Sequence, residues 1–120
     1  MASSSKTNPH LVRVVRELRD ASREQGVAIW RDVADRLERS RRNWSEVNVS
    51  RLARYAAKGE QVVVPGVLLA AGEIRVPVTV AAFRASEGAR TKVVAAGGKA
   101  LDLLELVASN PKGRGVRIMG

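Results

Sequence analysis

The residues with the clearest chemical potential lie between Arg36 and Tyr55, where arginines crowd a predicted junction between two helices. The segment Ser40–Asn43 contains the adjacent residues Arg41 and Arg42 and no acidic residue that would neutralise them. A guanidinium group can donate two parallel hydrogen bonds to a phosphate and can stack on bases, whereas an ammonium group is a point charge. This junction is therefore predicted to contact a polyanion.

A second set of arginines lies along the first predicted helix, residues 9–25. At 100° per residue, the apolar residues fall on one side of this helix and most arginines on the other. The apolar side comprises Leu11, Val14, Val15 and Leu18, and the opposite side comprises Arg13, Arg16 and Arg23, with Arg19 at its edge. Two interpretations remain open, namely a solvated surface balanced by acids such as Asp20 and Glu24, or a stripe that faces phosphates.

The sequence pattern predicts exposed positive charge on two further segments. The polar side of a third predicted helix includes Arg51, Arg54 and Lys58. The segment Asn110–Gly115 combines two glycines with Lys112 and Arg114. Glycine allows close approach of the backbone to a partner, and the cations suit a sugar-phosphate backbone. An ordinary surface turn is the alternative interpretation of Asn110–Gly115.

Motifs for catalysis or cofactor binding are missing from the sequence. It contains no G-x-x-x-x-G-K-[ST] loop, no G-x-G-x-x-G and no G-x-S-x-G. The only histidine, His10, has no second ligand or base nearby in the sequence, and the absence of cysteine excludes thiolate metal sites and disulfides. We therefore predict that the protein is not an enzyme and has no catalytic residue, metal or cofactor.

The composition supports a polyanionic partner. The 21 Lys and Arg residues exceed the 12 Asp and Glu residues, which gives a net charge of +9 and a pI near 11.2. Sixteen of the 21 cations are arginine. RNA, DNA or an anionic membrane surface is the leading class of partner. No apolar run is long enough to span a bilayer, so a protein that is soluble in the cytoplasm is expected.

Helices are predicted in the first half of the chain. Asn8 and Pro9 are typical of a helix start, and Gly26 of a helix end. A second helix is predicted over residues 28–39, with Trp30 in the core. Asn43 and Glu46 resemble a capping box, which predicts a third helix over residues 44–58.

Strands and helices alternate after Gly59. Strands are predicted at residues 61–64, 67–71, 74–83 and 116–119, with a turn at Pro65-Gly66, and helices at residues 87–95 and 101–109. The expected fold class is α/β in a single domain over residues 8–120, with a helical part at 8–58 and a mixed part at 59–120. Residues 1–7 are expected to form a disordered tail.

Several segments in the same order resemble a known family. These are KTNPHL, WRDVADRLERSRR, VNVSRLARYA, VVVPGVLLAAG, VTVAAF and NPKGRGVRI. The chain resembles the archaeal and eukaryotic large-subunit ribosomal protein called eighteen-e, which is related to bacterial large-subunit protein fifteen. The resemblance implies N-terminal helices followed by an irregular layered β-β-α core. It also implies a non-catalytic protein of the large ribosomal subunit in the cytoplasm, with large-subunit ribosomal RNA and neighbouring ribosomal proteins as partners.

Charge and position, and not the resemblance, select the residues expected to contact RNA. They are Arg13, Arg16, Arg19, Arg23, Arg39, Arg41, Arg42, Arg51, Arg54, Lys58, Lys112 and Arg114. The competing hypothesis is a DNA-binding regulator that uses residues 36–55 as a helix-turn-helix. Against it, Trp44 and Val47 stand where polar side chains would be needed to recognise bases.

Overall fold

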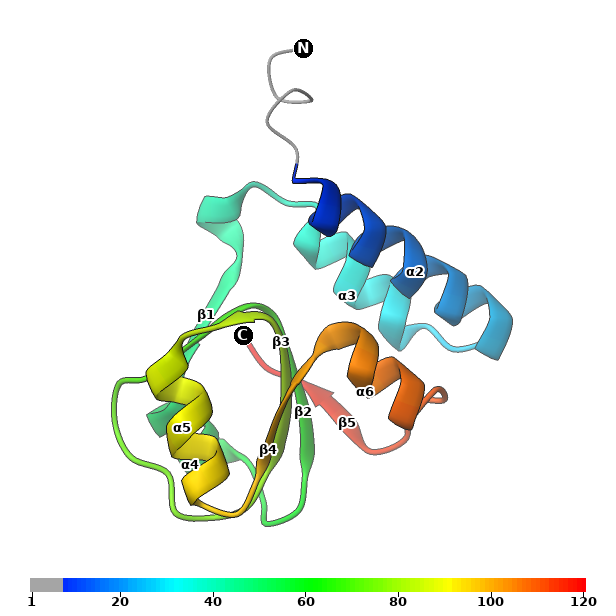
Figure 1. Cartoon of the computed structure of the whole chain (residues 1–120). Helices are drawn as coiled ribbons and strands as arrows, with labels where there is room; N and C mark the ends of the chain where they lie inside the picture. Colours follow the sequence, from blue (N-terminus) through cyan, green and yellow to red (C-terminus); the bar gives the residue numbers. More distant parts are fainter. Residues whose placement is uncertain (1–7) are drawn as a thin grey trace.

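The computed structural model describes residues 8–120, which form a parallel β-sheet with helices on both faces (Figure 1). In chain order the elements are α2 (Pro9–Gln25), α3 (Ile29–Leu37), the 3-10 turn η1 (Arg41–Asn43), β1 (Ser45–Asn48), α4 (Val49–Tyr55), β2 (Gln61–Leu69), β3 (Thr79–Ala85), α5 (Glu87–Ala95), β4 (Lys99–Asp102), α6 (Leu103–Ser109) and β5 (Val116–Ile118). The predicted class, a single α/β domain that begins with helices, is confirmed. The predicted tail of residues 1–7 lies outside the described residues.

All strand pairs of the five-stranded sheet are parallel, and four of the strands follow the order β1-β2-β3-β4. β3 runs along one side of β2, so β1 and β5 must share the other side. β5 pairs with the first part of β2, Gln61–Val63, and β1 pairs with its last part, Gly66–Leu69. The central strand β2 therefore pairs with three segments that are distant from one another in the sequence, namely β1, β3 and β5.

The two faces of the sheet build two separate hydrophobic cores. Successive side chains of a strand point to opposite faces, and both faces of a parallel sheet are usually covered. Val63 accordingly packs with α2, α3 and α6, whereas Val62 and Val64 pack on the side of α4 and α5. The α2–α3 pair seen in Figure 1 thus rests on one face of the sheet, with α4 and α5 on the other.

The first two helices follow their local sequence signals. The Asn8 side chain accepts a hydrogen bond from the His10 backbone N–H, Pro9 begins α2, and Gly26 ends it with a left-handed φ of 68°. Trp30 is fully buried, and its indole N–H donates to the backbone carbonyl of Pro111 at 2.7 Å. The prediction of Trp30 as a core residue is therefore confirmed, and α3 is shorter at both ends than predicted.

The predicted helix at residues 44–58 is wrong in its first part. Trp44 is extended, with φ −70° and ψ 151°, residues 45–48 form β1, and only Val49–Tyr55 are helical. Asn43 and Glu46 form no capping box. Pairing with β2 satisfies the backbone of β1 and buries Val47, and this long-range gain outweighs the local preference for a helix.

Three other predictions need correction. No turn separates two strands at Pro65-Gly66, because β2 runs through them with only an irregular pairing to β3 between Val64 and Val67. The strand predicted at 74–83 begins only at Thr79. The helix predicted at 101–109 begins at Leu103, after a capping box formed by Asp102 and Glu105. The helix at Glu87–Ala95 and the strand at the C-terminus are confirmed.

Glu60 links β5 to the start of β2. Its carboxylate accepts hydrogen bonds from the Arg117 guanidinium at 2.9 and 3.0 Å and from the Ala57 backbone N–H at 2.9 Å. The Ala57 hydrogen bond, together with the hydrogen bond and charge of Arg117, lowers the pKa of Glu60 despite the opposing effect of burial. The resulting stabilisation is present above the ordinary pKa of a glutamate and is lost as the pH falls through the lowered pKa.

Candidate nucleic-acid interface

The segment Glu38–Trp44, called the arm below, stands out from the body between α3 and β1 (Figure 1). Trp44 fixes it in place. The indole N–H of Trp44 donates to the backbone carbonyls of Leu37 at 3.0 Å and Arg39 at 3.1 Å. Its ring packs edge-on against Phe83 with centroids 5.3 Å apart. The arm is therefore held by a buried aromatic residue that leaves the arginine side chains free for other contacts.

Three arginines of the arm project without acidic partners. Arg39, Arg41 and Arg42 are exposed, and none forms an ion pair within residues 8–120. The Arg41 guanidinium lies 5.4 Å from the centroid of the Trp44 ring, a cation–π geometry. The arm thus presents concentrated and partly oriented positive charge, and its contact with a polyanion stays a prediction.

The arginines of α2 divide into different environments. Arg13 pairs with Glu17 and Arg23 pairs with Asp20, both at 2.7 Å, and all four side chains are substantially exposed. Such exposed pairs are weak, so either arginine can exchange its partner for a phosphate at small cost. Arg16 is exposed and unpaired within the described part of the chain.

Arg19 has a structural contact that the helical pattern did not reveal. Its guanidinium pairs with Asp35 at 3.0 Å and with Glu38, and so connects α2 to the end of α3. Burial lowers the pKa of Arg19, but the hydrogen bonds and charges of Glu38 and Asp35 outweigh that effect and raise it. Arg19 is thereby less available to an external anion than Arg16.

A groove of about 490 Å³ separates α2 from the arm. Its lining combines apolar side chains with several arginines. The apolar part comprises Leu11, Val12, Val15, Leu37 and Trp44, and the charged part comprises Arg16, Arg19, Glu38, Arg39 and Arg41. The fold therefore joins two predicted sets, the α2 stripe and the arm, into one surface, called the α2–arm surface below.

The loop of residues 110–115 packs against the other end of α2. The Lys112 ammonium donates to the backbone carbonyl of Gln25 at 3.1 Å, at the end of α2. Gly113 has a φ of 66°, and a Cβ there would lie 2.6 Å from the Ile29 side chain. This glycine serves close packing within the protein, whereas Arg114 is exposed.

The predicted residues of α4 lie apart from the α2–arm surface. Arg51 and Arg54 are exposed beside a hollow of about 280 Å³ that Ser50 and Tyr55 also line. The Arg54 guanidinium lies 5.9 Å from the centroid of the Tyr55 ring, and Lys58 follows in an exposed loop. Because α4 covers the opposite face of the sheet from α2, the predicted cations form at least two separate surfaces.

Arg31 is a further exposed cation that the sequence-based prediction did not include. It is exposed, and it lines a hollow of about 500 Å³ with Arg19 and Arg23 near the turn between α2 and α3. In the sequence Arg31 precedes Asp32, a natural ion partner. The structure instead pairs Asp32 with Arg36 at 3.1 Å. The only signal for Arg31 in the sequence is that it comes shortly after the end of α2, the helix that carries Arg19 and Arg23.

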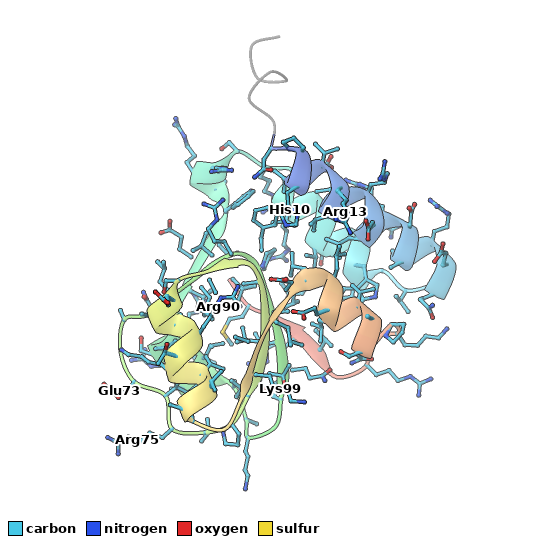
Figure 2. The ribbon with its side chains drawn as sticks, viewed as in Figure 1. His10, Arg13, Glu73, Arg75, Arg90 and Lys99 are labelled. Carbon is cyan, nitrogen blue, oxygen red and sulfur yellow. The ribbon has the colours of Figure 1, made fainter. Side chains whose placement is uncertain are left out.

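No group of three His, Asp or Glu side chains within residues 8–120 is placed to bind a metal ion. His10 lies beside Phe83, with ring centroids 5.5 Å apart, near Arg13 on α2 (Figure 2). None of the described helices is long and apolar enough to cross a bilayer.

Comparison with known proteins gives a consistent set of similarities. A family model described as ribosomal protein 60S L18 and 50S L18e matches residues 2–120. Proteins named large ribosomal subunit protein eL18 are similar over nearly their whole lengths. That of Methanospirillum hungatei is 45% identical over 97% of this chain and 96% of its own. The Halobacterium salinarum protein is 46% identical over 96% and 98%, and the Methanococcus maripaludis protein is 44% identical over 99% of both chains.

Proposed function

Because this chain belongs to the family of ribosomal protein 60S L18 and 50S L18e, and is thereby a constituent of the large ribosomal subunit, we propose that it binds and stabilises folded large-subunit ribosomal RNA through its arginine-rich surfaces. As a ribosomal protein it acts in the cytoplasm, and its role is structural. Other partners are neighbouring proteins of the large subunit.

The observation that carries this proposal is the arm. Arg39, Arg41 and Arg42 are exposed and have no ion partner within residues 8–120, although the chain contains 12 acidic residues. A cluster of unpaired like charges repels itself and gains most from a polyanion. Trp44 holds the arm in place through two backbone carbonyls, which reduces the entropy lost on binding.

The proposed contact residues are those selected by charge and position. They are Arg13, Arg16, Arg19, Arg23, Arg39, Arg41, Arg42, Arg51, Arg54, Lys58, Lys112 and Arg114. Most of them lie around α2, the arm and the 110–115 loop, whereas Arg51, Arg54 and Lys58 lie on or just after α4. A protein with cations on separate sides can neutralise the phosphates of two RNA segments and hold them at a fixed distance.

The architecture argues against the alternative of a helix-turn-helix regulator. A recognition helix must follow its partner helix after a short turn and must be free to enter the major groove. Here η1 and β1 separate α3 from α4, and β1 is paired within the sheet. α4 has only seven residues and rests on the sheet through Val49 and Leu52. Residues 36–55 therefore do not provide such a motif.

A competition experiment tests the proposal against this alternative. We expect fragments of large-subunit ribosomal RNA to compete with a labelled RNA ligand more effectively than duplex DNA with the same number of phosphates, since a folded RNA can bring phosphates to the separate cationic surfaces at once. Filter binding at fixed salt measures the two competitors. Equal or stronger competition by DNA would overturn the assignment to RNA.

A further inference from the structure

The groove between α2 and the arm has a charge balance that favours an anion. Arg16, Arg39 and Arg41 line it without an ion partner within residues 8–120. The single acidic residue in its lining, Glu38, already pairs with Arg19. An acceptor-rich, negatively charged group is therefore the complementary occupant.

The same groove also contains apolar surface that a phosphate alone would not cover. Val12 is 50% exposed and is one of the few large apolar side chains left open to water. Leu11 is partly exposed beside it, and Val15 and Leu37 form buried parts of the lining. An occupant that gains from this lining needs both a negative charge and an apolar, preferably flat, group. A nucleotide has both.

Arg41 offers a flat surface at the edge of this groove. Its guanidinium is placed against Trp44, 5.4 Å from the ring centroid, while the Arg41 side chain as a whole remains exposed. Guanidinium planes, like aromatic rings, stack on unpaired RNA bases. A base on Arg41 would extend the arrangement that Trp44 begins.

We propose that the α2–arm groove receives an unpaired base of the ribosomal RNA, stacked on Arg41, with the adjoining phosphates held by Arg16 and Arg39. This inference rests on the proposed function, because it specifies which feature of the RNA the α2–arm surface recognises. The surface then selects an unpaired nucleotide in addition to attracting phosphates.

Two charge-conserving substitutions in the full chain test the protein side of this inference. Arg41→Lys keeps the positive charge but loses the planar group, whereas Arg75→Lys makes the same change at an exposed arginine outside the groove lining and outside the proposed contact residues. The probe is the ribosomal RNA fragment that remains bound after nuclease trimming of the complex. We expect Arg41→Lys to weaken binding roughly five- to tenfold and Arg75→Lys to change it less than twofold. Equal effects of the two substitutions would overturn the inference.

Abasic substitutions in the same RNA fragment test the RNA side of the inference. Replacing unpaired nucleotides one at a time should reveal one position whose lost base weakens wild-type binding about as much as Arg41→Lys does. The two losses should not add, because both remove the same contact. If no abasic position weakens binding while binding stays strongly salt-dependent, the groove holds another occupant, such as an acidic protein segment. The inference then fails and the proposed function stands. Weak, salt-independent binding would overturn both.

Discussion

Replacing Arg39, Arg41 and Arg42 together by alanine is expected to weaken binding to a large-subunit ribosomal RNA fragment roughly a hundredfold at about 0.1 M salt. Each lost phosphate contact removes about 0.7 to 0.9 from the slope of log affinity against log salt, so loss of the Arg39 and Arg42 contacts removes about one and a half units. Loss of Arg41 removes a stacking surface as well. Folding should be little affected, since Trp44 hydrogen-bonds to the backbone carbonyls of Leu37 and Arg39 and not to these side chains. The unfolding midpoint should fall by no more than a few degrees.

A matched control separates local contacts from the general effect of net charge. Arg75, Arg90 and Lys99 are exposed cations outside the α2–arm surface, and Figure 2 shows Arg75 and Lys99 far from His10 and Arg13. Replacing these three by alanine lowers the net charge by the same amount. We expect the control variant to retain most of its affinity and slope in the same titrations. An equal loss in both variants would mean that total charge, and not the arm, determines binding.

Replacing Trp30 by alanine is expected to destabilise the fold by about 3 to 5 kcal/mol. Trp30 is fully buried in the core between the sheet and the α2–α3 pair, and its removal leaves a large cavity. It also leaves the Pro111 carbonyl without its indole partner, which releases the loop that carries Lys112 and Arg114. Such a loss is a large part of the total stability of a small domain, roughly 5 to 15 kcal/mol. Urea unfolding followed by circular dichroism measures it.

Trp30→Phe distinguishes the two contributions of the indole. Phenylalanine keeps most of the apolar packing but cannot donate to the Pro111 carbonyl, so its cost should be smaller, about 1 to 3 kcal/mol. If Trp30→Ala destabilised the protein by less than the range expected for Trp30→Phe, Trp30 would not be the core residue that links α3 to the C-terminal loop.

The elements that could be predicted from the sequence are those whose signals are local. α2 has a capping asparagine, a proline at its first position and a glycine after its last residue, all within the helix or next to it. α5 has a capping serine that accepts from the Ala89 backbone N–H at 3.1 Å. Local hydrogen bonds and helical periodicity were sufficient for such segments.

The misassigned elements depend on contacts between distant parts of the chain. β1 is a strand because its residues pair with Gly66–Leu69, about twenty positions away. Gly66 resembles a turn residue in the sequence, but it allows close approach, since a Cβ there would lie 2.1 Å from the Ser45 carbonyl oxygen. The parallel order of the sheet depends on crossovers that no local pattern specifies.

The candidate interface could be predicted only as a set of charges. The absence of acids around Arg41 and Arg42 is visible in the sequence, and the structure keeps these residues exposed. The pairing of Arg19 with Asp35 and Glu38 joins separate helices, so neither its availability nor the groove beside it was predictable. The twelve proposed contact residues remain a prediction about RNA binding.

Co-sedimentation of the protein with isolated large ribosomal subunits at increasing salt tests the central claim most directly. Binding through many phosphate contacts falls steeply with salt, because released counterions drive association. We predict that the protein sediments with the large subunit at low salt, dissociates only at high salt, and dissociates at lower salt when Arg39, Arg41 and Arg42 are replaced. Sedimentation apart from the subunit at low salt, or a bound fraction that is insensitive both to salt and to these substitutions, would contradict the claim.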